Sequence, residues 1–328
     1  MPPRDSFGRT IDYLRVSVTD RCNLRCIYCM PPAGVEKRSH REVLRYEELA
    51  LIVRAAAEIG ITKVRLTGGE PLVRLGLPEF VRMIASIPGI DDLSMTTNGT
   101  LLAGQAAALA EAGLHRVNIS LDTLDPERFA SMTRWGSLDD VWAGIAAARA
   151  TGLTPIKFNV VVIRGLNSDQ ITDFASKTLT DGWHVRFIEW MPIGSDTGWV
   201  PEGAVPSAEV RSEIEREFGP LHPVGGPEGS GPSRYYQLGG AEGTIGFISA
   251  LSAHCCPSCN RLRVTADGRL RPCLLDDHEF DLRVGLRQGA GLDTIKNLLT
   301  QAIQSKPSCH HLHEALPPHG RTMAQIGG

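Results

Sequence analysis

Long apolar runs are missing from this sequence, and so is an excess of charge of one sign. No stretch stays apolar over the roughly 18 residues that a membrane-spanning helix requires. The formal net charge is −3 over 328 residues, which offers no electrostatic footprint for nucleic acid or for a membrane surface. The first residues also lack the apolar core of a signal peptide. We therefore expect a cytoplasmic protein that acts on neither nucleic acid nor membranes.

Histidine is absent around the first group of cysteines. Cys22, Cys26 and Cys29 follow the spacing C-x3-C-x2-C, and no histidine lies within ten residues of them. Cytoplasmic thiols stay reduced, so clustered cysteines indicate metal ligands before disulfides. Three thiolates are one fewer than structural zinc or an ordinary iron–sulfur cluster uses. A [4Fe–4S] cluster on three thiolates would keep one iron open to another ligand. The alternative is a zinc knuckle or a set of buried thiols.

A second group of three cysteines stands more than 200 residues later. Cys256 and Cys259 form a C-x2-C unit, and Cys273 follows after 13 intervening residues. The ADG at 266–268 predicts a hairpin turn that returns Cys273 to this unit. A four-cysteine zinc hairpin is the serious alternative. Cys255 is adjacent to Cys256 and would point to the opposite face of an extended run, so we do not expect both to bind one metal.

Short β-rich runs alternate with amphipathic helical patterns through the first two-thirds of the chain. We expect strands at 13–19, 63–67, 93–98, 116–121, 156–162 and 184–190, and helices at 46–60, 77–87, 105–113, 138–152 and 168–179. The alternation predicts parallel βα units with right-handed crossovers. A closed barrel needs eight units. Six units therefore predict an incomplete (β/α)6 TIM-like barrel, with working residues after the carboxyl ends of its strands.

The pattern changes after residue 220. Residues 221–234 are rich in glycine and proline and predict a linker or surface loop. Residues 235–328 predict a β-rich extension with hairpins, the second cysteine group and a helix at 291–305. We therefore expect a barrel over 1–220, followed by the linker and the extension.

Basic residues occur inside the predicted strands. Arg15, Arg65 and Lys157 would point into the barrel, where an unpaired charge is costly. A triphosphate would compensate these charges, whereas an ion pair with Glu70 or Glu189 is the alternative. Two further arginines, at 261 and 263, share one face if their run is a strand. They could bind a phosphate or a purine, or form a solvated basic face.

Several motifs together resemble one family. The spacing of the first triad with Tyr28 before its last cysteine, and TGGEPL after the second strand, are similar to radical S-adenosylmethionine enzymes. The order of YLRVSVTDRCNLRCIYCMP, VRLTGGEPLVR, TTNG, VNISLDTL, IKFNVVV, RFIEWMP, CNRLRVTADGRLRPCL and the terminal IGG resembles the GTP 3′,8-cyclases of molybdenum-cofactor biosynthesis over nearly the whole chain.

The resemblance implies a reaction and two clusters. A [4Fe–4S] cluster on the first triad would cleave S-adenosylmethionine reductively, and the 5′-deoxyadenosyl radical would take hydrogen from C3′ of GTP. Bonding of C3′ to C8 would give 3′,8-cyclo-7,8-dihydroguanosine triphosphate. A second [4Fe–4S] cluster on Cys256, Cys259 and Cys273 would contact the guanine. An electron donor, a downstream cyclic pyranopterin monophosphate synthase and a homodimer are further expectations.

The resemblance also implies contact residues. Those for S-adenosylmethionine are Tyr28, Gly69, Ser120 and Met191. Those for GTP are Arg15, Arg65, Thr96, Lys157, Arg261, Leu262 and Arg263. Gly327 and Gly328 end the chain, and the family's final glycines are required for activity and reach into the active site. A frayed terminus is the ordinary alternative.

Two cysteines depart from the family pattern. Cys255 stands where a phenylalanine or another non-ligand is common. Cys309 has no assigned role, although with His310, His311 and His313 it could form an adventitious metal site or stay solvated. A peptide-modifying radical enzyme and a non-enzymatic zinc or iron–sulfur scaffold are the other hypotheses. The scaffold leaves the GGE turn and the barrel cations unexplained.

Overall fold

Six strands in chain order form the centre of the sheet in the computed structural model, which describes residues 2–36, 38–194, 198–229, 231–310 and 320–327. They are β1 (Tyr13–Ser17), β2 (Lys63–Thr67), β3 (Asp92–Thr97), β4 (Arg116–Ser120), β5 (Lys157–Val162) and β6 (His184–Glu189). Each is parallel to the next. The six predicted strands are therefore confirmed, with ends that differ by at most two residues.

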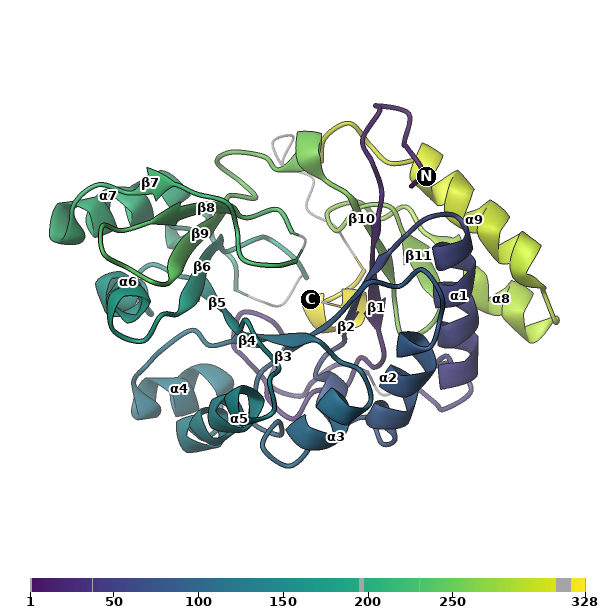
Figure 1. The fold of residues 1–328 in the computed structure, drawn as a ribbon, viewed down its shortest axis with the longest axis horizontal. Helices are drawn as coiled ribbons and strands as arrows, with labels where there is room; N and C mark the ends of the chain where they lie inside the picture. The colour runs from purple at the N-terminus through teal and green to yellow at the C-terminus, as the bar shows by residue number, and fades with distance from the viewer. Residues whose placement is uncertain (1, 37, 195–197, 230, 311–319, 328) are drawn as a thin grey trace.

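Helices on the outside of the curved sheet connect these strands or, in the case of α7, follow the last of them (Figure 1). They are α1 (Tyr46–Glu58), α2 (Leu77–Ala85), α3 (Ala106–Glu111), α4 (Pro126–Thr133), α5 (Leu138–Ala150), α6 (Ile171–Thr180) and α7 (Ser207–Phe218). Short 3-10 turns lie at η1 (Pro71–Val73), η2 (Ser168–Gln170), η3 (Pro201–Gly203) and η4 (Cys256–Ser258). Across the described residues, no helix combines the length and apolar character needed to cross a membrane.

Helix α4 was missed at the sequence level, although it carries a start signal. The Asp125 carboxylate accepts from the Arg128 backbone N–H at 2.7 Å, and Pro126 occupies the first turn. An Asp cap followed by proline is a common helix beginning. The segment has few apolar residues, so it lacks the apolar periodicity from which the other helices were predicted.

The C-terminal strands extend both edges of the same sheet. At one edge β9 (Thr244–Ile248) is parallel to β6 and is followed by β8 (Arg234–Gln237) and β7 (His222–Pro223), which are antiparallel. At the other edge β10 (Arg261–Val264) is parallel to β1 and is followed by the antiparallel β11 (Arg269–Arg271) and β12 (Phe280–Asp281). The predicted hairpin at ADG is the β10–β11 turn. The parallel pairing of β9 with β6 and of β10 with β1 was not expected.

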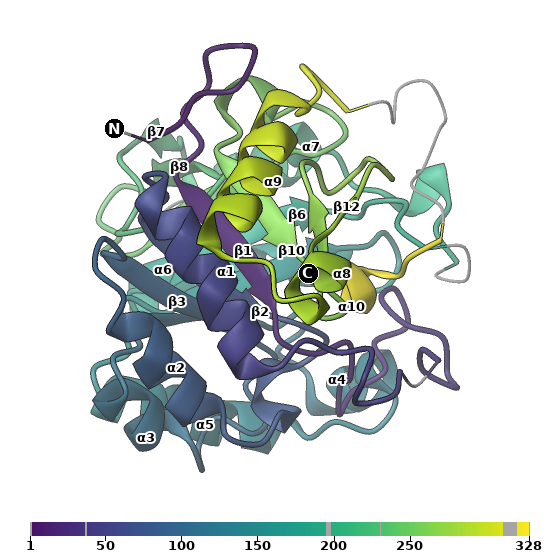
Figure 2. The same ribbon diagram turned by 90° about the vertical axis from the view of Figure 1, so that its right-hand side faces the viewer.

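The sheet stays open within the described residues, as the incomplete barrel predicts. Its strand order is β12-β11-β10-β1-β2-β3-β4-β5-β6-β9-β8-β7, so β9 and β10 are not paired with each other. Helix α9 (Leu292–Gln304) follows α8 (Leu282–Arg287) and packs beside α1 (Figure 2). The last helix, α10 (Met323–Ile326), lies in the opening of the curved sheet (Figure 1). The domain boundaries at 220 and 234 stay predictions.

The central strands alternate polar residues on the inner face with apolar residues on the outer face. In β1, Tyr13 and Arg15 line a central cavity, whereas Leu14 and Val16 are fully buried in the core beneath the helices. Successive strand residues point to opposite faces. Strands of parallel sheets are usually apolar on both faces. The polar inner face therefore indicates a space built for a ligand.

One close approach between a loop and a helix fixes the β3–α3 corner. A Cβ on Gly144 of α5 would stand 2.3 Å from the carbonyl oxygen of Gly99 and 3.1 Å from the Cβ of Leu102. Real Cβ atoms essentially never stand as close to a backbone oxygen as the first distance, and the second distance is tighter than most Cβ contacts. Only glycine fits at this position.

Replacing Gly144 by alanine should lower the free energy of unfolding by about 1–3 kcal/mol. The destabilisation caused by the overpacked methyl group should exceed the roughly 1 kcal/mol by which alanine stabilises a helix relative to glycine. Gly104→Ala is the matched control, because a Cβ there meets nothing within 4 Å, and we expect a change within about 0.5 kcal/mol. Urea unfolding followed by circular dichroism measures both. Equal stability of the two variants would contradict the close approach.

Candidate functional site

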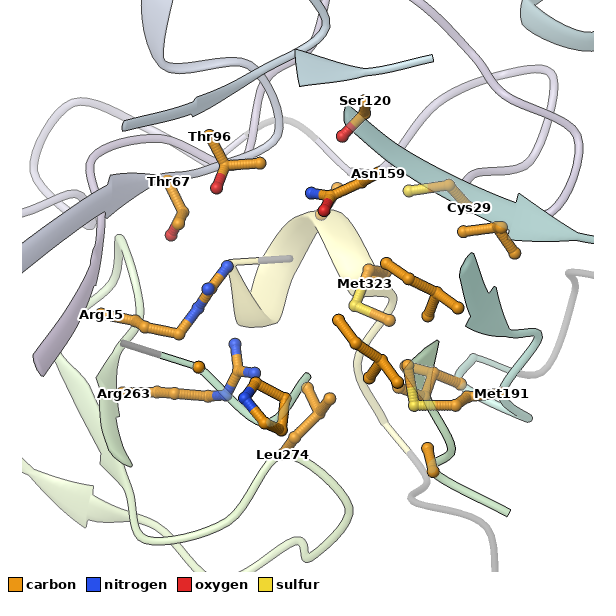
Figure 3. Close-up of a pocket in the computed structure, with 18 of the residues that line it drawn as sticks. Arg15, Cys29, Thr67, Thr96, Ser120, Asn159, Met191, Arg263, Leu274 and Met323 are labelled. Carbon is orange, nitrogen blue, oxygen red and sulfur yellow. The ribbon is translucent and has the colours of Figure 1, made fainter. Parts of the chain in front are cut away.

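One cavity of about 310 Å³ runs through the inside of the curved sheet, and all six cysteines of the two triads line it. The first triad follows the carboxyl end of β1. The second precedes β10 and follows β11, and the start of β10 is in register with the start of β1. The two triads therefore stand at opposite ends of the strands. Figure 3 shows other residues that line the cavity, with Met323 of α10 among them.

The loop of the first triad is held against the GGE turn after β2. The Gly69 N–H donates to the Thr19 carbonyl at 2.7 Å, and the Glu70 N–H donates to the Arg21 carbonyl at 2.8 Å. A Cβ on Gly69 would stand 2.4 Å from the Arg21 oxygen. The two glycines thus allow the backbone contact that positions Cys22.

The thiols of the first triad are poorly suited to stay ionised without a positive partner. Burial, aided by Glu70, raises the pKa of Cys22 to about 11, and burial raises that of Cys29 to about 12. The Cys22 Sγ accepts hydrogen bonds from the Leu24 N–H at 3.3 Å and from Asn98 Nδ2 at 3.9 Å. A bound metal centre would supply the missing positive charge.

The spacing of the triads does not match a single ion. A zinc ion places its thiolates about 3.8 Å apart, because each Zn–S bond is about 2.3 Å. Within the part of the chain that the structure describes, only His254, Cys309 and His310 bring three candidate ligand atoms within 4.8 Å of one another. Neither triad meets this limit, so at least one pair of thiols in each stands more than 4.8 Å apart. A cluster accommodates such a spacing, because each thiolate binds a different iron.

The residues expected to contact S-adenosylmethionine, which are Tyr28, Gly69, Ser120 and Met191, all line the cavity. Met191 packs in a small apolar cluster that also includes Cys273 of the second triad. The Tyr28 hydroxyl donates to the Asp122 carboxylate, which also accepts from the Val161 N–H. This pairing orients the tyrosine ring next to the cysteines.

Several buried polar atoms on the cavity wall have no partner among the described residues, and three of them are side-chain oxygens of β2, β3 and β5. These three are Thr67 Oγ1, Thr96 Oγ1 and Asn159 Oδ1. Ser120 is in register with Asn159 on the neighbouring strand, and Figure 3 shows both side chains on the same side of the cavity. Buried polar groups are normally hydrogen-bonded, so a polar ligand is expected here. Asn159 was not predicted.

The second triad is held by a buried lysine and by an arginine from the N-terminal segment. The Lys306 ammonium donates to the carbonyls of Arg261 at 2.8 Å and Pro272 at 2.6 Å, and lies 3.8 Å from Cys259 Sγ. The Arg9 guanidinium donates to the Cys256 carbonyl at 2.8 Å. These contacts join both arms of the hairpin that carries the triad.

The thiols of the second triad differ in acidity. Burial acts to raise the pKa of Cys259, but the charges of Arg261 and Lys306 outweigh it and lower that pKa to about 6. Burial raises the pKa of Cys256 to about 12 and also raises that of Cys273. Cys255 lines the cavity too, and its Sγ accepts from Arg261 at 3.5 Å.

Three arginines stand side by side across neighbouring strands. Arg15 is in register with Arg263 on β10 and with Arg65 on β2. Burial lowers the pKa of Arg15 to about 10, and Arg65 and Arg261 add to the effect. Burial and the nearby Arg15 hold the pKa of Arg263 well below its ordinary value. This concentration of positive charge favours a ligand with several negative charges.

The acidic partners that we considered for these cations are used elsewhere. The Glu70 carboxylate accepts from the N–H groups of Leu72 and Asn98 and from a threonine hydroxyl. The Glu189 carboxylate accepts from the N–H groups of Leu251 and Ser252, among others. Neither forms an ion pair among the described residues. The internal ion pairs are therefore not formed.

Lys157 lies under the glycine-rich segment instead of on the cavity wall. Its ammonium donates to the carbonyls of Pro227, at 3.3 Å, and Glu228. Burial, with the charges of Arg186 and Arg116, lowers the pKa of Lys157 to about 7. Backbone carbonyls thus take the place that an anion would fill.

Leu262 lies in surroundings other than those expected, and Arg186 is a cavity residue that was not predicted. Leu262 packs in the hydrophobic core and does not line the cavity, so only its backbone could contact a ligand there. Arg186 on β6 lines the cavity, and its buried Nε has no partner among the described residues. The signal was available, because RFIEW places a cation between apolar residues just as YLRVS does.

The C-terminal helix enters the same cavity. Met323 and Ala324 line it, and the Gly327 carbonyl accepts from the Arg263 guanidinium at 3.1 Å. A Cβ on Gly327 would stand 2.8 Å from Ser17 Cβ and from Thr67 Oγ1, so this position needs glycine. Gly328 lies outside the described residues, as do His311 and His313.

An ion-pair cluster fixes the chain where it turns into α10. Arg321 contacts Asp267 at 3.1 Å and Glu279 at 2.7 Å. Asp267 also pairs with Arg38 at 2.8 Å. The cluster ties the tail to the β10–β11 turn.

Two family models match the chain. That of the Radical SAM superfamily covers residues 16–177, and that of Molybdenum Cofactor Synthesis C covers residues 183–312. The chain is 54% identical over 325 residues to the GTP 3′,8-cyclase of Pelotomaculum thermopropionicum, across 99% of this chain and 100% of that protein. It is 52% identical over 325 residues to the GTP 3′,8-cyclase of Heliobacterium modesticaldum, across 99% of both chains.

Solved structures share the fold at low sequence identity. Streptococcus suis SuiB bound to S-adenosylmethionine has a TM-score of 0.61 at 14% identity, over 87% of this chain and 68% of that one. The structure of anSMEcpe with bound AdoMet has a TM-score of 0.59 at 14% identity, over 93% of this chain and 79% of that one. These likenesses confirm the expected fold.

Replacing Arg321 by methionine should free the tail while leaving the sheet intact. Loss of the charged hydrogen bonds to Asp267 and Glu279 should speed amide exchange at residues 323–327 by about tenfold or more. Hydrogen–deuterium exchange read by mass spectrometry measures this. Arg164→Met is the control, because its pair with Glu209 is half-exposed on both sides and should not affect the tail. Unchanged exchange in Arg321→Met would show that the cluster does not hold α10.

Proposed function

The chain belongs to the GTP 3′,8-cyclase family of the radical S-adenosylmethionine superfamily, and from this premise we propose how its cavity serves that reaction. It is an enzyme of molybdenum-cofactor biosynthesis that uses an iron–sulfur cluster and S-adenosylmethionine. The observation that carries the proposal is the single cavity with a cysteine triad at each end and cations between them. We assign S-adenosylmethionine to the first end and GTP to the second.

Cys22, Cys26 and Cys29 would hold the [4Fe–4S] cluster. Their half-buried thiols and their count of three support a cluster with one iron open. When bound, that cluster supplies the electron that cleaves S-adenosylmethionine to a 5′-deoxyadenosyl radical. The side chains and backbone of the protein would bind the reactants, orient them and shield them from water.

The residues beside the first triad would orient S-adenosylmethionine. The Gly69 backbone lies close to the triad loop and offers room for the amino group of the ligand. Ser120 and the unpartnered oxygen of Asn159 could bind its hydroxyls. Tyr28, fixed by Asp122, and Met191 would pack against the rest of the molecule. The Thr96 hydroxyl faces the same space and is assigned to GTP.

The inner cations would bind the triphosphate. Arg15 and Arg65 stand in one register row, and Arg186 reaches the cavity from β6. Four phosphate charges would compensate a cluster of buried positive charge that is otherwise costly. For Lys157, we propose that the triphosphate replaces the carbonyls of residues 227 and 228.

A second [4Fe–4S] cluster on Cys256, Cys259 and Cys273 would hold the guanine. The low pKa of the Cys259 thiol favours a thiolate ligand. Arg261 and Arg263 extend from the adjoining strand toward the cavity, where they would bind the ribose-phosphate side of GTP. With the two ends occupied, C3′ of GTP would face the adenosyl group across the middle of the cavity.

The tail would complete the site. Gly327 stands between Arg263 and the ends of β1 and β2. We propose that Gly327 and Gly328 position Arg263 and help to exclude water from the radical. The cyclised nucleotide would pass to a cyclic pyranopterin monophosphate synthase, and a separate protein would donate the electron. A homodimer and a cytoplasmic location stay predictions.

Replacing one cysteine of each triad should separate the two halves of the reaction. Cys22→Ala should lower 5′-deoxyadenosine formation more than about 100-fold, because it removes a first-cluster ligand. Cys256→Ala should keep measurable cleavage of S-adenosylmethionine but lower the yield of cyclised nucleotide about tenfold or more. Chromatography of both products after anaerobic turnover measures this. Wild-type cyclisation by Cys256→Ala would show that the second triad does not serve GTP.

Binding of GTP should weaken as the pH rises above 7. The pKa of Lys157 is lowered to about 7 without a ligand, so above this pH the amine is mostly neutral and must take up a proton to bind phosphate. Affinity should fall by up to about tenfold per pH unit. Calorimetric titration between pH 6.5 and 8.5 measures it. Lys157→Arg stays charged over this range, so its pH dependence reports the ionisation of GTP itself. If the affinities of wild type and Lys157→Arg changed with pH in parallel, Lys157 would not be a phosphate ligand.

A further inference from the structure

His254, Cys309 and His310 form a third cluster of metal-ligating side chains. Their candidate ligand atoms all lie within 4.8 Å of one another, and no other such trio occurs in the described ranges. None of the three belongs to a cysteine triad. Of the histidines that could accompany Cys309 by sequence, only His310 is described, and the fold adds His254 from 55 residues earlier.

The two imidazoles already face each other. His254 Nδ1 and His310 Nε2 are 2.9 Å apart, and the rings meet edge to face with centroids 4.4 Å apart. His310 Nε2 also lies 2.9 Å from the Ala250 carbonyl oxygen. Two ring nitrogens this close must share a proton, because two lone pairs would repel. A metal ion can replace that proton.

Both chain segments that carry the cluster are fixed in place. The Arg9 guanidinium donates to the carbonyls of Pro307 at 2.7 Å and Ser308 at 3.2 Å, and also to the Cys256 carbonyl at 2.8 Å. Lys306 is anchored to the β10–β11 hairpin. A site formed by pinned segments loses little entropy when an ion binds.

The donor set suits zinc. One thiolate and two neutral imidazoles are common Zn²⁺ ligands, and three protein ligands leave a fourth position open. Nitrogen ligands about 2.0–2.1 Å from a tetrahedral ion lie about 3.3 Å apart. The rings would need to separate by only a few tenths of an ångström from their present spacing. Carboxylates are absent from the trio, which argues against Mg²⁺ and Ca²⁺.

We propose that His254, Cys309 and His310 bind one Zn²⁺ ion, apart from the iron of the two triads. The ion would join the loop that leads into η4 to the segment after α9. The His310 backbone N–H donates to the Cys256 thiol, and His310 is part of the cavity wall. The zinc would therefore hold one wall of the GTP end of the cavity. The site itself does not depend on the proposed function.

Metal analysis of anaerobically purified protein, loaded with iron and then exposed to ZnCl₂, tests this site. After removal of loosely held ions with a weak chelator, wild type should retain about one zinc per chain. Cys309→Ser and His254→Gln should each lower zinc about tenfold or more while iron stays unchanged. Cys255→Ser is the matched control and should keep its zinc, because Cys255 is bonded to Arg261 instead.

X-ray absorption at the zinc edge reads the ligands directly. Wild type should show one sulfur at about 2.3 Å and two nitrogens at about 2.0–2.1 Å, and Cys309→Ser should lose the sulfur. A shell of three or four sulfurs would place zinc in a triad and overturn the proposal. Loss of iron from Cys309→Ser would overturn it too, because Cys309 would then serve the second cluster. Absence of zinc from wild type would do the same.

Discussion

The parallel pairing of β10 with β1 is the contact on which the rest of the structure depends. It joins a strand near residue 262 to one near residue 15 and sets Arg263 beside Arg15. Because β10 runs in the same direction as β1, the cysteines before it lie at the end of the barrel opposite Cys22. One cavity therefore has a triad at each end. The tail reaches that cavity through the β10–β11 turn, to which Arg321 ties it.

The second constraint is the cost of the charge inside the cavity. Burial deprives these cations of hydration and neighbouring arginines repel them, so the pKa values of Arg15 and Lys157 are lowered. Folding tolerates this because apolar residues on the outer face of the same strands form the core. A polyanionic substrate would recover the electrostatic cost on binding. Stability and substrate recognition are thus divided between the two faces of each strand.

Much of this architecture could be predicted from the sequence, and the failures have physical causes. The six strands and both triads were visible because their signals are local: hydrophobic period, glycine turns and cysteine spacing. The joining of β9 and β10 to the sheet edges was not, because pairing between residues as distant as His184 and Thr244, or Tyr13 and Arg261, leaves no local trace in the sequence. Arg186 was missed although its alternation matches that of Arg15. The approach of His254 to Cys309 depends on the fold alone.

The most direct test of the central claim, that the two ends of one cavity hold different molecules, uses two variants that each lack a triad. One replaces Cys22, Cys26 and Cys29 by alanine, and the other replaces Cys256, Cys259 and Cys273. Electron paramagnetic resonance of the reduced proteins would be recorded with GTP and with S-adenosylmethionine. We predict that the variant without the first triad changes its spectrum with GTP but not with S-adenosylmethionine. The variant without the second triad should change its spectrum with S-adenosylmethionine but not with GTP. If GTP left the spectrum of the variant without the first triad unchanged, the assignment of GTP to the second end of the cavity would be wrong.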